Sequence, residues 1–271
     1  MKCTVSIRAL CVIEYEKYIY LDVYKTGSAH LKHLLPEITE GEQVRLRRHA
    51  PITAARPYGW TGGKLVFVTV RNPWDWYTSL WSYACERKGA IWRFFSEALP
   101  RDELKSMFNT EDPVRSFEKW LRAVNDKDFM QRVIRNNLPE SGLAGIVGLY
   151  TFRFMRVTTP YPTVFLKSWL VPSIDAAIRY ERWFHMYSEV LRSESLNADL
   201  KSFVAKYRQR CRFKPDAEEI IDRLAAAPRN ASTRVLPSFR DYYTDETRQL
   251  VADKDRLFLE LFGYRFEKPP S

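Results

Sequence analysis

Apolar residues on consecutive or alternating positions predict three strands in the first third of the chain. The segments YIYLDVY (18–24) and KLVFVTV (64–70) are almost continuously apolar, which is typical of strands covered on both faces of a parallel sheet. The segment QVRLRR (43–48) alternates and predicts a weaker strand. MKCTVSIRALCVIEYEK, at the N-terminus, is interpreted as a first strand and not a signal sequence, because acidic residues follow its short apolar run and no small-residue cleavage site is evident.

Helical periodicity follows the strand at 18–24 and dominates after residue 73. In SAHLKHLL (28–35) the leucines recur at helical spacing. PWDWYTSLWSYACERK (73–88) opens with Pro73 at the first helical position, where proline is favoured, and runs to Gly89. Further helices are predicted at 112–124, with an apolar face of Phe117, Trp120, Leu121 and Val124, and at 216–226.

The remaining segments are assigned from weaker signals. IDAAIRYE (174–181) predicts a further strand, and residues 136–162, rich in Gly, Pro and Thr, predict a loop or excursion near a binding surface. Thr244 is the predicted N-cap of a final helix, DETRQLVADKDRLFLELF, with acidic residues in its first turn and Gly263 past its end.

The order strand–loop–helix–strand–helix–strand predicts an α/β fold with a central parallel sheet flanked by helices. No internal repeat, low-complexity tract or interdomain linker is evident, so we expect a single domain over residues 1–271. Within it, residues 90–170 are expected to form a mainly helical and loop excursion on the side that binds the acceptor.

Composition adds a charge argument. The chain has 271 residues with 43 Lys and Arg against 33 Asp and Glu, a formal net charge of +10. Such an excess indicates an acidic partner, namely nucleic acid, an anionic membrane surface or a polyanionic cofactor or substrate; the alternative is a protein that is simply basic. No stretch approaches the roughly 18 apolar residues of a membrane span. The four cysteines are widely spread and form no C-x-x-C pair: Cys3, Cys11, Cys85 and Cys211. This spacing argues against a zinc knuckle or a dense disulfide framework and favours reduced thiols in a cytoplasm.

The first candidate site is the loop between the strand at 18–24 and the following helix. A strand that runs through a turn into a helix directs backbone N–H groups and the positive end of the helix at one spot. Lys25 adds a cation, Thr26 and Ser28 add hydroxyl groups, and Gly27 permits a sharp turn. The pattern G-x-x-x-x-G-K-[ST] of nucleotide triphosphatases is absent. The alternative interpretation is an ordinary turn with a surface lysine.

The second candidate site is FVTVRNPWDWYTSLWSY (67–83). Arg71 follows the strand at 64–70, where α/β sheets bind ligands at the carboxyl ends of their strands, and a guanidinium group can grip a phosphate with two hydrogen bonds. Ser79 lies six residues into the next helix. The alternative is an arginine at a strand end that is paired with a carboxylate.

Together, K-T-G-[ST] after the first of these strands and V-R-N-P-x-x-x-x-x-S after the later one resemble the sulfotransferases that use 3′-phosphoadenosine 5′-phosphosulfate (PAPS), in particular their carbohydrate and bacterial branch. The resemblance implies a nucleotide-kinase-like, P-loop type of fold. In that family the first loop wraps the 5′-phosphosulfate, a role that falls here to Lys25, Thr26, Gly27 and Ser28. The second element holds the 3′-phosphate, a role that falls to Arg71 and Ser79.

The likeness extends to both ends of the chain. RRHAPITAAR (47–56) is similar to the family's K-H-a-t-a segment, and IRYE (178–181) to its fourth-strand R-F-E. The C-terminal part from Arg229 to Phe266 resembles the family's N-A-S loop followed by Y-R-D-Y-Y and F-G-Y-x-F. Two departures are evident: Tyr24 stands where proline is common, and Ser238-Phe239 where Pro-Tyr is usual.

The resemblance assigns the catalytic residues. Lys25 is suited to the leaving bridge oxygen, and His49, which matches the family's catalytic histidine position, is the predicted general base for the acceptor hydroxyl. The alternative for His49 is a basic patch with the arginines of 45–48, and the other histidines are interpreted as surface or packing residues. Asn230-Ala231-Ser232 is formally a glycosylation sequon, but the resemblance places this loop beside the cofactor, with Arg234 as a further phosphate contact.

The resulting prediction is a cytoplasmic PAPS-dependent sulfotransferase that releases 3′-phosphoadenosine 5′-phosphate (PAP) and requires no metal. The acceptor is predicted to be a hydroxyl group on a carbohydrate, as part of a glycan or glycolipid, and no nucleic acid is expected as partner. Two alternatives are a nucleotide kinase or P-loop ATPase, which would need the missing second glycine and Mg²⁺, and a non-catalytic basic module that binds nucleic acid or an acidic glycan.

Overall fold

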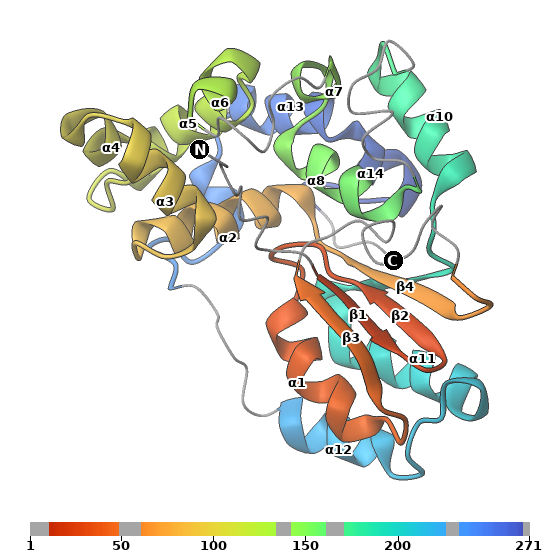
Figure 1. Ribbon diagram of the computed structural model, residues 1–271. Coiled ribbons are helices and arrows are strands. Elements are labelled where there is room, and N and C mark those ends of the chain that lie inside the picture. The colour runs from red at the N-terminus through yellow and green to blue at the C-terminus, as the bar shows by residue number, and fades with distance from the viewer. Residues whose placement is uncertain (1–10, 49–60, 134–141, 161–170, 226–232, 268–271) are drawn as a thin grey trace, which may run out of the picture. The chain divides into compact units, whose positions relative to one another are not determined.

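The computed structural model describes residues 11–48, 61–133, 142–160, 171–225 and 233–267 (Figure 1). The chain divides into two compact units. The sheet unit comprises Met1–Val70, Arg156–Pro162 and His185–Arg229, and the helical unit comprises Arg71–Met155, Thr163–Phe184 and Asn230–Ser271. This division leaves the single domain over residues 1–271 as a prediction.

The sheet unit is built on a five-stranded sheet in the order β3-β1-β2-β4-β5. β2 pairs in parallel with β4, and β4 in parallel with β5, whereas β1 is antiparallel to both β2 and β3. The α/β class is therefore confirmed, with a mixed sheet. The strands are β1 (Cys11–Tyr15), β2 (Tyr18–Leu21), β3 (Gln43–Arg48), β4 (Leu65–Val70) and β5 (Glu189–Arg192).

The prediction of a central parallel sheet holds for β2, β4 and β5 and is wrong at the N-terminal side of the sheet. Only Glu16 and Lys17 separate β1 from β2, and so short a link permits only an antiparallel pair, in which Ile13 lies opposite Tyr20. β3 forms where the weaker strand was expected, but it pairs with β1 at the edge of the sheet. β2 also ends earlier than predicted, at Leu21, so Asp22 belongs to the following loop.

One hydrophobic core joins a face of this sheet to three helices, α1 (Ser28–Ile38), α11 (Leu196–Cys211) and α12 (Ala217–Ala225). Alternate residues of β2 and β4 contribute their side chains to it, because successive side chains of a strand point to opposite faces. The helices predicted at 28–35 and 216–226 are confirmed. The fully buried members of this core include Tyr18, Tyr20, Phe67, Leu31, Leu34, Leu35, Leu200 and Val204.

The helical unit starts with α2 (Pro73–Cys85), in which Pro73 occupies the first turn as predicted. α5 (Pro113–Val124) buries the predicted apolar face of Phe117, Trp120, Leu121 and Val124. The tryptophans of α2 are buried and belong to the core of this unit. The other helices that the structure describes in this unit are α3 (Gly89–Ala98), α4 (Arg101–Met107), α6 (Lys127–Val133), α7 (Gly142–Ile146), α8 (Leu149–Thr158, up to Met155 in this unit), α10 (Ile174–Phe184), η4 (Phe239–Tyr242), α13 (Asp245–Lys254) and α14 (Arg256–Phe262).

The strand predicted at 174–181 is wrong, because these residues lie in α10. Ala177, Ile178 and Glu181 are its buried positions, a spacing of three and four that fits a helix and not a strand. The similarity of IRYE to a strand motif therefore has no counterpart in the structure. β5, which the sequence reasoning missed, is the strand that extends the parallel part of the sheet.

Two further expectations need correction. Residues 142–146 and 149–158, within the predicted loop, form α7 and α8. The final helix is capped by Thr244 as predicted, but it is interrupted at Asp255, so that α13 and α14 replace one continuous helix. Gly263 ends α14 in the left-handed conformation, with φ of 70°.

Candidate functional site

The loop after β2 reaches α1 through two residues with positive φ. Lys25 has φ of 65° and Gly27 has φ of 98°. A Cβ atom on Gly27 would lie 2.6 Å from Cδ2 of Leu196, at the start of α11, so both the backbone conformation and the close packing require glycine. The loop is thus built around Gly27, and Lys25 is one of three described residues other than glycine with positive φ.

Thr26 points inward and fastens this loop to β4. Its hydroxyl donates to the carbonyl oxygen of Val23 at 2.6 Å and lies 2.5 Å from Oγ1 of Thr69, which in turn lies 2.8 Å from the hydroxyl of Tyr20. All three hydroxyl-bearing side chains are buried. The side chain of Thr26 therefore shapes the loop, and any contact it makes with an anion would come from its backbone.

The residues at the N-terminus of α1 suit the binding of an anion. Gly27 is the N-cap and provides no side-chain cap, and the first turn contains no acidic residue. The carbonyl oxygen of Gly27 accepts from the backbone N–H groups of His30 and Leu31, at 3.0 and 3.2 Å. Because the first N–H groups of a helix point outward along its axis, the positive end of α1 and the charge of Lys25 act in the same loop.

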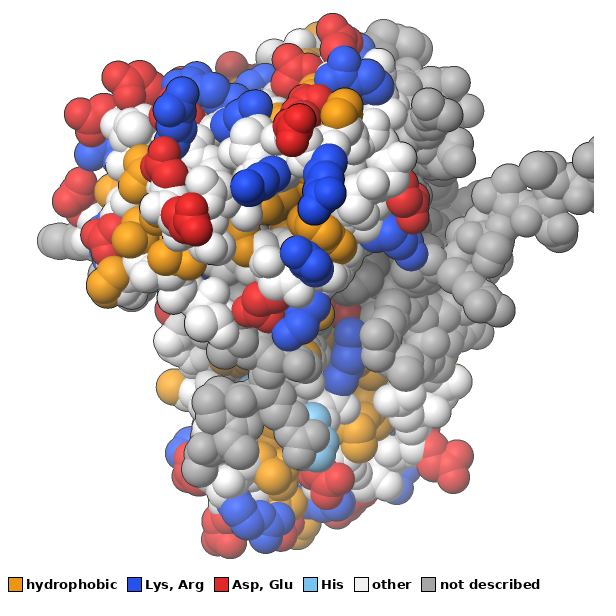
Figure 2. Space-filling view, turned by 90° about the vertical axis from the view of Figure 1, so that its left-hand side faces the viewer, with side chains coloured by type: hydrophobic (Ala, Val, Ile, Leu, Met, Phe, Trp, Pro, Cys, Tyr) orange, Lys and Arg blue, Asp and Glu red, His pale blue; other side chains and the backbone are white. Residues whose placement is uncertain are grey.

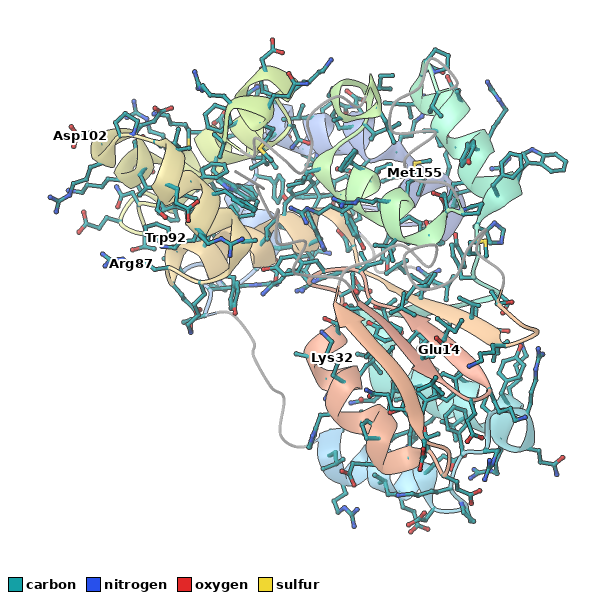
Figure 3. All side chains as sticks on the ribbon, viewed as in Figure 1. Glu14, Lys32, Arg87, Trp92, Asp102 and Met155 are labelled. Carbon is teal, nitrogen blue, oxygen red and sulfur yellow. The ribbon has the colours of Figure 1, made fainter. Side chains whose placement is uncertain are left out.

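A buried carboxylate, that of Asp22, lies at the beginning of this loop. Asp22, the first residue after β2, is fully buried, and its Oδ2 lies 2.8 Å from Nζ of Lys32, which Figure 3 labels on α1. This ion pair ties the beginning of the loop to the second turn of the helix. Asp22 is therefore paired with Lys32, a partner that belongs to the helix.

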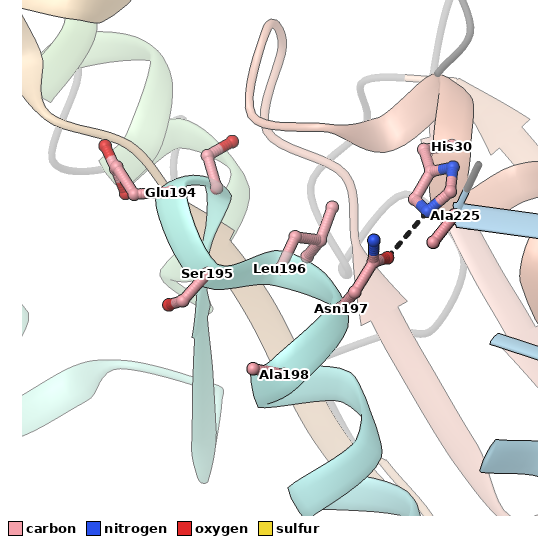
Figure 4. A pocket seen from close by; sticks show the side chains of 8 residues that line it. His30, Glu194, Ser195, Leu196, Asn197, Ala198 and Ala225 are labelled. Atoms are coloured by element: carbon pink, nitrogen blue, oxygen red, sulfur yellow. Dashed lines mark hydrogen bonds between the residues drawn. The ribbon is translucent and has the colours of Figure 1, made fainter. Parts of the chain in front are cut away.

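A shallow pocket of about 350 Å³ lies in the sheet unit where α1 faces the segment after β5 (Figure 4). His30 lies on one side, and its Nε2 is 2.8 Å from Oδ1 of Asn197. Ser193 connects the pocket to the loop, since its Oγ would lie 3.6 Å from a Cβ atom on Gly27. The complete lining consists of His30, Ser193, Glu194, Ser195, Leu196, Asn197, Ala198 and Ala225.

Sequence reasoning missed this pocket and interpreted His30 as a surface histidine. Because β5 was not recognised, the segment that follows it, residues 193–198, was not expected beside α1. Glu189–Arg192 is only four residues long and two of them are charged, so it lacks the apolar run that identified β2 and β4. One feature of the sequence could have indicated the pocket: His30 lies in the first turn of the helix that follows the Lys25–Ser28 loop.

In the helical unit, Arg71 and Arg234 share one carboxylate. Nε of Arg71 donates to Oδ2 of Asp75 at 2.8 Å, and a terminal nitrogen of Arg234 donates to Oδ1. The side chains of Arg71, Asp75 and Arg234 are 18%, 15% and 26% exposed, so the cluster is largely removed from water but reaches the surface. Two residues predicted to bind phosphate, 163 positions apart in the chain (234 − 71), thus meet at Asp75.

The electrostatics of this cluster favour the ionised carboxylate. Burial alone would raise the pKa of Asp75, but the guanidinium groups of Arg71 and Arg234 lower it further than burial raises it, and the net pKa lies below its ordinary value. The cluster of two cations and one anion therefore keeps a net positive charge. The alternative in which Arg71 is paired with a carboxylate is confirmed, since Asp75 is that partner, and Arg234 pairs with the same carboxylate.

The residues between Arg71 and Asp75 form the start of α2. Oδ1 of Asn72 accepts from the backbone N–H groups of Trp74 and Asp75, at 3.1 and 3.4 Å, and Nδ2 donates to the carbonyl oxygen of Arg265 at 3.0 Å. Ser79 is buried and lies one helical turn after Asp75, on the same side of α2. The segment from Arg71 to Ser79 therefore contains the capped start of α2. Its polar residues Arg71, Asp75 and Ser79 are spaced four residues apart.

Other candidates fall outside this picture. His49, the predicted general base, and the Asn230–Ser232 loop lie outside the described residues, so their roles stay predictions. In the part of the chain that the structure describes, no three His, Cys, Asp or Glu residues are grouped as metal ligands. The same residues include no helix that combines the length and the apolarity needed to cross a bilayer.

The positive charge is dispersed in the face shown in Figure 2, where Lys and Arg side chains are intermixed with Asp and Glu. Several basic side chains of α11 and the residue after it are engaged in ion pairs: Lys201 with Asp222, Lys206 with Glu189, Arg208 with Glu218, and Arg212 with Glu16. In each of these pairs the carboxylate offsets part of the positive charge of its partner. This helix therefore does not present the continuous basic strip of a nucleic-acid interface.

Comparison of the chain with protein-family models, with curated proteins and with solved structures gave no match. The functional argument therefore depends on the residues themselves. In the sheet unit these are the loop at 22–28, the start of α1 and the adjoining pocket. In the helical unit they are the Arg71–Asp75–Arg234 cluster and the first turns of α2.

Proposed function

We propose that this chain is a sulfotransferase that moves a sulfuryl group from PAPS to a hydroxyl group, with a carbohydrate as acceptor and a P-loop type of sulfotransferase fold. The observation that carries the proposal is the loop after β2, where Lys25 and Gly27 lead into a helix start without an acidic residue or a side-chain cap. Such a loop suits a group with several anionic oxygens. β2, which precedes it, has the parallel neighbour β4, as expected for ligand sites at strand ends of α/β sheets.

The cluster in the helical unit supports the second part of the proposal. PAPS carries a 3′-phosphate besides its 5′-phosphosulfate, and a phosphate monoester is best bound by guanidinium groups in fixed positions. Arg71 and Arg234 are held by one carboxylate, which orients both. We assign the 3′-phosphate to these two residues, with Ser79 in the adjoining turn as a third member.

The reaction follows from these roles. The bond between sulfur and the bridging phosphate oxygen breaks, a bond forms between sulfur and the acceptor oxygen, and PAP leaves with the additional negative charge on its 5′-phosphate. Lys25 and the start of α1 stabilise that charge, which is the larger electrostatic demand of the step. The acceptor proton passes to a base, which we assign to His49. By these roles the chain's own residues supply the charge stabilisation and the proton acceptor.

The pocket at His30 offers room beside the same loop. Its volume of about 350 Å³ accommodates part of a nucleotide, and its lining combines a histidine, an asparagine and two serines with small apolar residues. We assign the pocket to the bound cofactor and not to the acceptor, because it adjoins Gly27 through Ser193. The cytoplasmic location stays part of the proposal, in agreement with the free thiols of Cys85 and Cys211.

A thermal-shift comparison tests the proposal against its rivals. PAP without metal, at about 100 times its Kd, should stabilise the protein by about 2.7 kcal/mol, which raises Tm by roughly 5–10 °C for a chain of this size. ATP with Mg²⁺ and a short oligonucleotide serve as the competing ligands. Stabilisation by ATP–Mg²⁺ or by the oligonucleotide, with none by PAP, would contradict the proposal. Transfer of radiolabelled sulfate from PAPS to a panel of glycans then identifies the acceptor.

A further inference from the structure

Tyr150 is clamped between two aromatic rings and contacts the backbone of Arg71. It lies in the first turn of α8, fully buried. Its ring stacks on Trp76 at 4.4 Å and on Phe258 at 3.9 Å, with an interplanar angle of 10° in both cases. Its hydroxyl accepts a hydrogen bond from the backbone N–H of Arg71 at 2.9 Å. Because the ring cannot tilt between its two neighbours, the position of the hydroxyl is fixed.

The helix that carries Tyr150 is itself held at its start by side chains from other elements. The first N–H groups of a helix have no partner within it. In α8 the N–H of Leu149 donates to Oδ1 of Asn125 at 3.2 Å, and that of Tyr150 donates to the hydroxyl of Tyr77 at 3.3 Å. The N–H of Thr151 donates to Oδ1 of Asp255 at 2.8 Å. Asn125 just after α5, Tyr77 of α2 and Asp255 at the break between α13 and α14 thus each satisfy one of these groups.

The same side chains are linked to one another. The hydroxyl of Tyr77 lies 2.8 Å from Oδ2 of Asp255 and 3.0 Å from Oδ1 of Asn125. Gly148, just before α8, packs so closely that a Cβ atom there would lie 2.3 Å from the carboxylate of Asp255. Its N–H donates to the carbonyl oxygen of Lys254 at 2.7 Å. The start of α8 therefore has little freedom to shift relative to α2.

Arg71 is fixed at two points that act on different parts of the residue. Asp75 holds the guanidinium group through Nε, and Tyr150 holds the backbone through N–H. A change at the backbone of Arg71 moves its whole side chain, whereas Asp75 lies only four residues further on, in the first turn of α2. The hydrogen bond from the backbone N–H of Arg71 to Tyr150 ties this residue to α8, in the core of the unit.

We infer that Tyr150 is a positioning residue for anion binding at Arg71: its hydroxyl, fixed by the network of Tyr77, Asn125 and Asp255, sets the place of the guanidinium group. The inference rests on the proposed function, in which Arg71 binds the 3′-phosphate of the cofactor. It adds a residue that carries no charge and that no motif indicated. In this inference Tyr150 acts on the ligand only through Arg71, so its effect on binding should disappear when the Arg71 side chain is removed.

The test compares two ligands and a double-mutant cycle. Tyr150→Phe removes the hydroxyl and keeps the stacked ring. By calorimetry it should weaken PAP binding about three- to tenfold, while competition by 5′-AMP, which lacks the 3′-phosphate, stays within twofold of wild type. In an Arg71→Ala background, Tyr150→Phe should have no further effect on PAP. Tyr18→Phe, which loses a buried hydroxyl 2.7 Å from Thr39 in the sheet unit, is the matched control and should bind PAP like wild type.

The outcomes separate the inference from the proposed function. Absence of PAP binding by the wild-type protein would refute the proposed function, and the inference with it. Normal PAP binding by wild type and equally tight binding by Tyr150→Phe would overturn the inference alone, as would an effect of Tyr150→Phe that persists without Arg71. Amide exchange at Arg71 in the unliganded wild type provides a check that needs no variant: it should be slow, and fast exchange would contradict the hydrogen bond to Tyr150.

Discussion

Arg71 and Asp75 lie one helical turn apart at the start of α2, and Nε of Arg71 donates to the Asp75 carboxylate at 2.8 Å. Arg234, which follows far along the chain, contacts the other oxygen of the same carboxylate. One anion thus organises two cations and leaves one net positive charge. Donors that are already oriented lose less conformational freedom when they bind a ligand, so such a cluster suits an anion of fixed shape.

Arg71→Ala and Arg234→Ala should each weaken PAP binding at least tenfold, or about 1.4 kcal/mol, because each removes a charged donor to the phosphate. The affinity for 5′-AMP should change much less, since this ligand lacks the 3′-phosphate. Isothermal titration calorimetry with the two ligands measures both effects. Arg115→Ala, an exposed arginine on α5, controls for the loss of one positive charge. Equal losses for PAP and 5′-AMP would show that the cluster does not bind the 3′-phosphate.

Gly27→Ala should destabilise the protein by about 2–4 kcal/mol, the sum of a left-handed conformation and a side chain forced against Leu196. It should also weaken PAP binding, because relief of the contact displaces the loop. Gly63→Ala is the matched control: Gly63 also has positive φ, 75°, but a Cβ atom there meets nothing within 4 Å, so only the conformational part of about 1–2 kcal/mol applies. Chemical denaturation of both variants gives the comparison, and equal losses would contradict the packing argument.

Local signals in the sequence were sufficient for the elements beside the candidate site. Pro73 and the side chain of Asn72 define the start of α2, and Gly27 defines the turn into α1. These features depend on residues within a few positions of each other, which is why their spacing could predict them. Thr244 at the start of α13 belongs to the same class.

Features that depend on distant residues could not be read in this way. The contact between Arg234 and Asp75 joins residues 159 positions apart, and nothing in either neighbourhood indicates it. At the interruption, the carboxylate of Asp255 accepts hydrogen bonds from Tyr77 and from the backbone N–H of Thr151, both distant in the chain, whereas the local pattern favours a continuous helix. The hairpin of β1 and β2 was missed because its link, Glu16-Lys17, has none of the glycine or asparagine typical of tight turns.

Asp255 should make stability fall as pH rises from 4 to 7. Its burial raises its pKa from 3.8 to about 6, although Thr151 and Tyr77 partly oppose this by hydrogen bonding to the carboxylate. The native state therefore binds this proton more tightly than the unfolded state does. The stability that the protonated Asp255 contributes is fully present below about pH 4 and is lost as the pH rises through about 6. A difference of about two pH units corresponds to about 3 kcal/mol.

The measurement is the free energy of unfolding of wild type minus that of Asp255→Asn, which cannot titrate at this position, at several pH values. This difference should decrease by about 3 kcal/mol between pH 4 and pH 7. Subtraction removes the contribution of groups such as Asp75, whose pKa is shifted in the opposite direction. Asp253→Asn changes the same charge on the exposed side of α13 and serves as control. A difference that stays constant with pH would refute the assignment to Asp255.

His49→Ala should lower the turnover of sulfate transfer at least tenfold while PAP binding persists, because the proposed reaction uses His49 to accept the proton of the acceptor hydroxyl and not to hold the cofactor.

Lys25→Ala should show a different pattern from His49→Ala. Loss of the lysine should weaken both PAP binding and sulfate transfer, since the lysine contacts the leaving phosphate in the bound and in the reacting state. His185→Ala, an exposed histidine, controls for loss of an imidazole. Steady-state rates with labelled PAPS, together with PAP titrations, separate the two patterns. Unchanged turnover in His49→Ala would remove this residue from the mechanism, and a partial rescue of its activity by added imidazole would place the lost step at proton transfer.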